Sequence, residues 1–353
     1  MTAAYFFSRR GVSSTILEPS GRIGGLIQTE RLHGCELEAG PDSYIAAKTA
    51  VTDTAREIPG LEQQIIGSND QARRIFLVKD GRLVAMPHGM VMMVPGEWGP
   101  ALRSPLFGWK TKLHFLREYA QHPRVRNNDI SIADFIGDHF DDTILEYVTE
   151  PLLTGVYGGS AAQLSAKSVL PRFLDYEEKY GSLIRGVRQE RARQKRSGSL
   201  FRSFQGGMQT FTDALFQASG THLTIVHGAA RHVERNSGKW RIQTEDNSFT
   251  ADHLVSAVPS HVAAGLFDTS VPELSAELAQ IPYSSSIIVV AGYRKSMLGH
   301  ALDGFGFLVP RKERRLVAAA TWVNTTSPAR VTDGIAVLRA FLVDSDAEQL
   351  MAA

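Results

Sequence analysis

The spacing of apolar residues along the chain predicts strands that alternate with helices. Residues 12–17 form an apolar run of strand length that ends at Glu18. Two further apolar runs, 75–78 and 83–86, are separated by Lys79-Asp80-Gly81-Arg82. An Asp-Gly pair between such runs is typical of a tight antiparallel hairpin. The first half of the chain is therefore expected to contain both a buried strand and a hairpin.

The same patterns place the remaining elements. Helices are expected at 3–10, 48–58, 131–140 and 209–218, with capping residues at Ser131 and Ser165, and residues 98–200 are mostly helical in pattern. Further strands are expected at 26–29, 35–37, 223–226, 229–234, 240–244, 253–257, 286–293, 306–309, 316–322 and 335–342. Because two groups of strands alternate along the chain, the domains that they form should be interleaved.

We predict an α/β fold of mixed α+β type in three parts. Residues 1–60 and 203–260 form a Rossmann-like nucleotide-binding domain. Residues 61–97 and 261–353 form a second domain around a mixed sheet, and residues 98–202 form a helical insert. The length of 353 residues is sufficient for two domains and an insert.

Composition excludes several classes of protein. Hydrophobic residues make up 43% and charged residues 21%, which is ordinary for a globular chain, and the net charge of +1 argues against nucleic-acid binding. Cys35 is the single cysteine, so neither an internal disulfide nor a thiolate metal cluster is possible. No run of 18 apolar residues predicts a spanning helix.

The stretch ILEPSGRIGGLIQTE, at 16–30, has the pattern of the second half of a dinucleotide-binding unit. Glu18, at the strand tip, can accept hydrogen bonds from both ribose hydroxyls of an adenosine, although an ordinary surface glutamate is the alternative. Gly24 and Gly25 let the backbone approach a pyrophosphate, which Arg22 can neutralise; a tight turn with a solvated arginine is the alternative. The two features together favour nucleotide binding.

Two further segments are candidates for ligand contacts. Gly40-Pro41-Asp42-Ser43 is expected to open a helix, either with its N–H groups facing a flavin or phosphate oxygen or simply with Asp42 or Ser43 as N-cap. Arg73 and Arg74 precede an apolar strand, so one of them can enter a pocket and hold a carboxylate; two solvated arginines are the alternative.

Other chemistry has little support in the sequence. There is no H-E-x-x-H, C-x-x-C or G-x-S-x-G motif, so an enzyme with this sequence would take its chemistry from a cofactor, with no metal and no catalytic side chain. The segment 185–202 is rich in Lys and Arg. It is either a solvated face or a contact with an anionic membrane surface.

Several motifs, in order along the chain, carry a resemblance to a known family. ILEPSGRIGGLIQTE followed by LEAGPDSY resembles flavin-dependent oxidases and desaturases such as amine oxidase and phytoene desaturase. The likeness narrows to the bacterial oxygen-dependent protoporphyrinogen oxidase family through EPLLTGVYGGSAAQLSAKSVLPRF (150–173), SFQGGMQTF (203–211), PYSSSIIVVAGY (282–293) and GFGFLVPRKERR (304–315). The resemblance covers nearly the whole chain.

The resemblance implies an FAD-binding domain, a substrate domain and a helical membrane-associated domain. By position, Glu18 would hold the adenosine ribose, and Arg22, Gly24 and Gly25 would line the pyrophosphate. Gly40, Pro41, Asp42 and Ser43 would lie against the flavin. Ala230 falls where the family usually has a valine whose backbone contacts the adenine end, and Arg74 matches the arginine that pairs with a substrate propionate.

The implied reaction is the oxidation of protoporphyrinogen IX to protoporphyrin IX, in haem biosynthesis. Six hydrogens leave in three two-electron steps, with FAD as cofactor and O₂ as acceptor. Coproporphyrinogen III is the nearest alternative substrate, and an amine or a carotenoid precursor is a more distant one. The family further implies a cytoplasmic protein with peripheral contact to the inner face of the cell membrane, and a homodimer.

The sequence departs from the family at both ends. A G-x-G-x-x-G loop normally lies about 20 residues before the acidic residue, but only seventeen residues precede Glu18. The family also continues by roughly a hundred residues, which is within the ordinary size of such units. We therefore expect unpaired strand edges and weak or absent FAD binding, from a misplaced start or a truncated gene. An inactive fragment or an interaction module is the remaining alternative.

Overall fold

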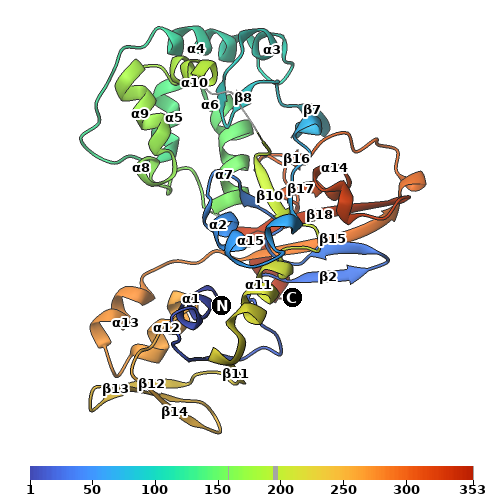
Figure 1. Ribbon diagram of the computed structural model, residues 1–353. Coiled ribbons are helices and arrows are strands. Elements are labelled where there is room, and N and C mark those ends of the chain that lie inside the picture. Colours follow the sequence, from blue (N-terminus) through green and yellow to red (C-terminus); the bar gives the residue numbers. More distant parts are fainter. Residues whose placement is uncertain (158, 194–197, 353) are drawn as a thin grey trace.

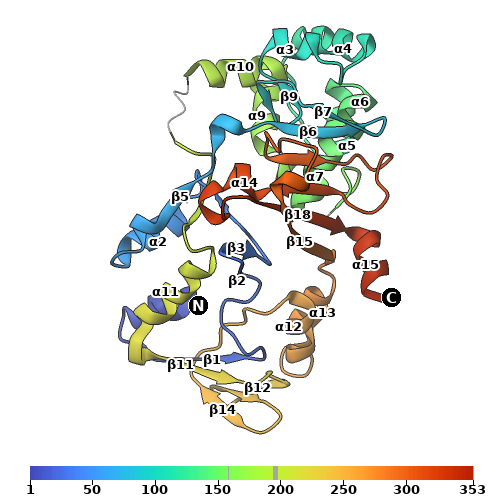
Figure 2. The same ribbon diagram turned by 90° about the vertical axis from the view of Figure 1, so that its right-hand side faces the viewer.

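The computed structural model describes all residues except 158, 194–197 and 353 (Figure 1). It contains a helical part, a six-stranded sheet and a third part built from smaller sheets. Figures 1 and 2 both show the six-stranded sheet in the middle, with the helices beyond one side of it and the smaller sheets beyond the other. The mixed α/β class predicted from sequence is confirmed.

The part that contains Glu18 is assembled from two distant stretches of chain. β1 pairs in parallel with β11, in a register that joins Ser14 to Leu223 and Glu18 to His227. β10 lies between β4 and β5 in a three-stranded sheet. The elements are α1 (Thr2–Ser8), β1 (Ser14–Glu18), β2 (Thr29–Leu32), β3 (Cys35–Glu38), β4 (Tyr44–Ile45), α2 (Ala50–Glu57), β5 (Ile65–Gly67), β10 (Phe201–Phe204), α11 (Gln209–Ser219) and β11 (Leu223–His227).

One predicted strand next to this part is absent. Residues 253–257 form no strand, and the third strand of the neighbouring sheet is β14 (Ser248–Ala251), which pairs with β13 (Lys239–Gln243). The prediction was wrong because a strand needs a hydrogen-bonded neighbour. Within the described chain β1 is paired on one side only, by β11, and no strand lies beside 253–257, where Val255 is 57% exposed.

The small antiparallel sheet next to β11 is covered by two helices. It consists of β12 (His232–Asn236), β13 and β14. α12 (Ser260–Phe267) contributes Ala263, Leu266 and Phe267 to a core shared with Val233 and Ile242 of the sheet. α13 (Pro272–Ala279) packs beside α12. Helices α12 and α13 therefore begin where the predicted nucleotide-binding segment, 203–260, ends.

The central sheet has the strand order β15-β18-β17-β16-β6-β7. Asp80 and Gly81 turn the β6–β7 hairpin with φ of 52° and 69°, as predicted from the Asp-Gly pair. β6 and β16 pair in parallel, so residues 75–79 join the sheet formed by the last third of the chain. The elements are β6 (Ile75–Lys79), β7 (Arg82–Ala85), β15 (Ser286–Arg294), β16 (Gly306–Leu308), β17 (Ala319–Trp322), α14 (Val323–Thr326), β18 (Ile335–Val343) and α15 (Asp344–Ala352).

Residues 90–193 form the helical part, which begins with two short strands and then follows the mostly helical pattern predicted from residue 98. Ser131 accepts a hydrogen bond from Asp134 N and Ser165 from Ser168 N, both at 3.0 Å, so both predicted caps are confirmed. Its elements are β8 (Met90–Val91), β9 (Val94–Pro95), α3 (Trp98–Arg103), α4 (Trp109–Tyr119), α5 (Ile132–His139), α6 (Asp142–Ile144), a π-helical turn (Leu145–Thr149), α7 (Glu150–Tyr157), α8 (Ala166–Val169), α9 (Pro171–Tyr180) and α10 (Leu183–Arg193).

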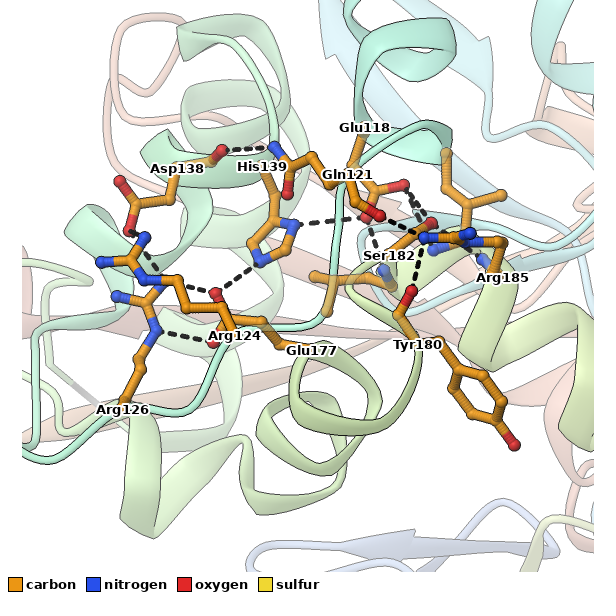
Figure 3. Close-up of polar contacts among 12 residues, drawn as sticks. Glu118, Gln121, Arg124, Arg126, Asp138, His139, Glu177, Tyr180, Ser182 and Arg185 are labelled. Carbon is orange, nitrogen blue, oxygen red and sulfur yellow. Dashed lines mark hydrogen bonds and ion pairs between the residues drawn. The ribbon is translucent and has the colours of Figure 1, made fainter.

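A buried ionic network joins four helices of this part (Figure 3). His139, at the end of α5, contacts Glu118 of α4 through Nδ1 (3.2 Å) and Glu177 of α9 through Nε2 (3.3 Å). Glu118 also accepts hydrogen bonds from Ser182 Oγ and from the N–H of Leu183, which starts α10. The network therefore fixes how the four helices pack.

Candidate functional site

Glu18 lies at the carboxyl end of β1, where the predicted ribose contact requires it. Its backbone oxygen accepts from Gly228 N at 3.0 Å, and its Oε1 accepts from the N (2.9 Å) and Oγ (2.8 Å) of Ser20. The preceding Leu17 packs in the same apolar cluster as Ala230. The structure therefore brings Glu18 and Ala230 to the same edge of the β1–β11 pair, with Oε2 of Glu18 left to accept further hydrogen bonds.

The turn after β1 has a shape that requires glycine. Gly24 and Gly25 have φ of 107° and 59°, and a Cβ on Gly24 would lie 3.0 Å from the backbone oxygen of Ile27. Arg22 donates to the oxygens of Ile27 (2.9 Å) and Gly25 (2.5 Å). Its guanidinium therefore stabilises the turn, and its predicted contact with a pyrophosphate stays a prediction.

The segment 40–43 does not open a helix, so that prediction was wrong. α2 begins only at Ala50, after Thr49, and residues 44–45 form β4, which pairs with Phe201 and Arg202 of β10. Pairing with a strand more than 150 residues away overrides the local capping pattern. The backbone groups of 40–43 are therefore presented by an extended loop and not by a helix N-terminus.

Gly40 nevertheless has a reason to be glycine. A Cβ at this position would lie 1.8 Å from the backbone oxygen of Leu26, which belongs to the loop that carries Gly24 and Gly25. The two predicted cofactor loops therefore touch each other through Gly40. Glu18, the glycine turn, residues 40–43 and Ala230 all lie in the same part of the molecule.

Buried charges that the sequence did not reveal hold this region together. Arg330 lies 3.1 Å from Glu38, and both side chains are 2% exposed. Arg339 Nη1 lies 2.5 Å from Asp42 Oδ2. Burial lowers the pKa of Arg330 and raises the pKa of Glu38, and the attraction between the two groups offsets part of each shift. Arg339 interrupts the apolar run of β18, which is the one pattern that could have indicated a buried arginine.

Arg74 lies apart from these residues, at the start of β6. It precedes the strand, and its Nη1 lies 2.5 Å from Asp303 Oδ2 with both side chains about half exposed. Its backbone oxygen accepts from Phe305 N at 2.7 Å. The guanidinium is accessible and pairs with a carboxylate of the chain itself, so its predicted contact with a substrate propionate stays a prediction.

No alternative centre stands out among the residues that the structure describes. A cavity of about 560 Å³ is lined by residues that include Lys295, His300 and Asn324. None of the predicted site residues lines it. No group of three or more His, Cys, Asp and Glu side chains suited to a metal ion occurs in the described part of the chain. Among the helices of the described residues, none has the length and apolar character needed to cross a membrane.

The residues present are compatible with a dinucleotide cofactor whose ribose lies at Glu18. The half-buried Glu18 offers a free carboxylate oxygen to a ribose. The positive φ at Gly24 and Gly25 lets the turn fold without side chains, and the close approach at Gly40 packs the loop 40–43 against that turn. Glu18, Gly24, Gly25 and residues 40–43 are therefore the residues that would hold such a cofactor.

Comparison with known proteins agrees with this description. The family described as flavin containing amine oxidoreductase matches residues 1–353. A coproporphyrinogen III oxidase of Bacillus subtilis is 27% identical over 347 residues, covering 96% of this chain and 72% of that protein. The human protoporphyrinogen oxidase is 27% identical over 338 residues, covering 89% of this chain and 68% of that protein. The names of both relatives thus describe enzymes that act on porphyrinogens.

Solved structures show the same fold. A "putative protoporphyrinogen oxidase" from Exiguobacterium sp. 255-15 has a TM-score of 0.87 at 26% identity, and covers 99% of this chain and 76% of that one. Cyclohexylamine oxidase from Brevibacterium oxydans has a TM-score of 0.64 at 15% identity, and covers 99% of this chain and 74% of that one. The second likeness establishes the fold alone.

Proposed function

Because the chain belongs to the flavin-containing amine oxidoreductases, we propose that it oxidises a porphyrinogen to the corresponding porphyrin with FAD as cofactor and O₂ as electron acceptor, in haem biosynthesis. The observation that carries this proposal is the position of Glu18, at the end of β1 beside a glycine turn and the 228–230 backbone. Protoporphyrinogen IX is the first candidate substrate. Coproporphyrinogen III is the second, favoured by the names of the bacterial relatives.

The roles of the residues follow from their positions. Glu18 would hold the ribose hydroxyls and Ala230 would contact the adenine end through its backbone. Gly24 and Gly25 would let the pyrophosphate approach, and residues 40–43 would lie against the ring system. Once bound, the flavin supplies the two-electron oxidation, and the chain itself binds and orients the substrate.

Flavin uptake and turnover test the proposal directly. The purified protein, incubated with FAD and desalted, should retain the visible absorbance of bound flavin, in contrast to the weak or absent binding expected from the lack of a G-x-G-x-x-G loop. On addition of either porphyrinogen under air, porphyrin fluorescence should then grow faster than in a protein-free control. Protein that is folded by circular dichroism but retains no flavin would refute the proposal, as would fluorescence that grows no faster than the control.

Arg74 is proposed to hold a propionate of the substrate, and its replacement should separate binding from turnover. We expect Arg74→Ala to raise KM for the porphyrinogen about tenfold while kcat changes little, since a charge-assisted hydrogen bond is lost in the bound and reacting states alike. Arg73→Ala is the matched control, because Arg73 is the exposed neighbour of Arg74, and its KM should stay within about twofold. Equal KM values for the two variants would contradict the assignment.

We also propose peripheral contact with the inner face of the cell membrane through α4. Trp109, Leu113 and Leu116 lie on one face of this helix, at positions i, i+4 and i+7, and are 72%, 57% and 55% exposed. Lys110, Lys112 and Arg117 lie on the same helix. Exposed apolar side chains flanked by cations are typical of helices that lie in a membrane interface. Figures 1 and 2 place α4 at the end of the molecule opposite β14.

The basic segment at 185–202 supports this contact less than the sequence indicated. Arg185 donates to the backbone oxygens of Gln121 and Tyr180, and Arg191 pairs with Glu97. Residues 194–197 lie outside the described chain. Both arginines thus tie α10 to the rest of the helical part, and α4 becomes the better candidate.

Vesicle binding tests the role of α4. The double variant Trp109→Ser and Leu113→Ser should bind anionic phosphatidylglycerol vesicles at least tenfold more weakly in a sedimentation assay, since burial of even one large apolar side chain is worth about 1.5–3 kcal/mol. Val125→Ser removes an equally exposed apolar side chain outside α4 and should bind as the parent protein does. Unchanged binding of the double variant would exclude this surface.

The family resemblance also supports a homodimer, which light scattering would detect.

A further inference from the structure

Two buried arginines from the last 25 residues of the chain hold the segment 40–43. Arg339, on β18, is 3% exposed, and Arg330, at the end of a short 3₁₀ helix (Pro328–Arg330), is 2% exposed. Lone arginines are rarely so buried unless they are paired. Their partners in this structure all lie near the predicted flavin loop or in the strand behind it.

Arg339 donates hydrogen bonds to the segment 40–43 at two points. Its Nη1 donates to Asp42 Oδ2 at 2.5 Å and its Nη2 donates to Gly40 O at 2.6 Å. One planar guanidinium therefore fixes both a side chain and a backbone carbonyl two residues apart. A lysine could not make both contacts with the same geometry.

Arg330 supports the same segment from behind. Its Nη1 donates to Asp42 O at 3.2 Å, and its Nη2 donates to Ser203 Oγ at 2.5 Å. The same hydroxyl of Ser203 donates to Asp42 O at 2.6 Å. Residues 40–43 belong to no helix or strand, so these side-chain contacts define their path in place of a backbone ladder.

Both guanidinium groups also retain an unused donor. Nε of Arg330 and Nε of Arg339 are buried without an acceptor among the described residues. Buried unsatisfied donors are uncommon and call for an explanation such as an ordered water or a bound group.

We propose that Arg339 is a positioning residue that sets the path of residues 40–43 for cofactor binding, with Arg330 as its support. The identity of the bound group as FAD rests on the proposed function, whereas the positioning of the loop does not. Arg339 itself is buried behind the loop and acts through Asp42 and Gly40.

Hydrogen exchange in the absence of any cofactor tests the positioning. In Arg339→Met we expect the amides of Asp42, Ser43 and Tyr44 to exchange at least tenfold faster. Arg314→Met is the matched control, because Arg314 is also largely buried and pairs with Asp346 at 3.2 Å, away from the loop. It should change neither this exchange nor the FAD affinity, even if it lowers Tm by the same amount.

FAD titration, followed by flavin fluorescence, gives the second measurement. Kd should rise at least tenfold in Arg339→Met and by an intermediate factor in Arg339→Lys, which keeps one contact. If Arg339→Met does not fold, Asp42→Asn leaves both arginines in place and should show smaller changes in the same direction. Unchanged exchange at 42–44, or the same change in Arg314→Met, would overturn the proposal. Absence of FAD uptake by the parent protein would refute the proposed function and leave the exchange result to decide the positioning.

Discussion

Replacing Arg330 with methionine is expected to lower the free energy of unfolding by about 3–5 kcal/mol, as is typical when one partner of a buried ion pair is removed. The variant would leave the Glu38 carboxyl group, which is 2% exposed, without its cation. It would also remove the hydrogen bonds to Ser203 Oγ and Phe204 O. Urea unfolding followed by tryptophan fluorescence measures the change.

Two controls separate the ion pair from simple loss of volume. Arg56→Met removes an exposed arginine that pairs with Asp53 and Glu62, and its effect should stay below about 1 kcal/mol. Glu38→Gln combined with Arg330→Met should recover part of the loss, because the unpaired buried charge is then gone. The interpretation fails if the double variant is less stable than Arg330→Met alone.

Elements that depend on neighbouring residues were predictable from the sequence. Asp80-Gly81 forms the expected hairpin because its two residues adopt positive φ at little cost. Ser131 caps α5 through the backbone of Asp134, three residues away. His33 and Gly34, with φ of 51° and 75°, turn the β2–β3 pair, although β2 starts at Thr29, where the sequence predicted its end. In each case the deciding contacts lie within a few residues.

Two segments whose structure depends on distant partners were predicted wrongly. Residues 40–43 have the composition of a helix start, but Tyr44 and Ile45 pair with Phe201 and Arg202 instead. Residues 253–257 have the composition of a strand and find no strand to pair with in the described chain. Composition specifies what a segment can form, and the neighbour supplied by the fold decides whether it does.

The candidate site shows the same division. Glu18, Gly24 and Gly25 lie on one local motif, and the sequence located them together. Arg330 and Arg339 reach this region only because the chain returns after almost 300 residues. Arg330 follows Pro328 in a short turn that has no distinguishing pattern, so nothing in the sequence pointed to its burial.

The helical part is expected to be most stable between about pH 4.5 and 6.5, because of the network in Figure 3. Burial alone would lower the pKa of His139, but its hydrogen bonds to Glu118 and Glu177 outweigh burial and raise it. Burial alone would raise the pKa of Glu177, but hydrogen bonds from His139 and Arg126 lower it to about 2. The pKa shift at His139 therefore makes stability fall at high pH, and the shift at Glu177 makes it fall at low pH.

The sign of each contribution follows from these shifts. A raised pKa at His139 means that its contribution is complete below the ordinary value of 6.5 and is lost as the pH rises through the folded-state pKa. A lowered pKa at Glu177 means that its contribution is complete above 4.5 and is lost as the pH falls toward 2. The shift at Glu177 corresponds to about 3 kcal/mol at neutral pH.

His139→Leu should therefore abolish the loss of stability on the alkaline side and lower stability most near pH 6, by about 2–4 kcal/mol, because Glu118 and Glu177 stay buried without the imidazolium between them. Tm measured from pH 4 to 9 tests this, together with hydrogen exchange in α9 and α10 to locate the change. His88→Leu is the control: His88 also contacts a carboxylate, Glu97, but its side chain is 82% exposed, so the pH profile should match that of the parent protein. If the Tm of His139→Leu is lower than that of the parent protein by the same amount at every pH, the ring contributes by packing alone. A contribution from the charged imidazolium would make the difference in Tm depend on pH.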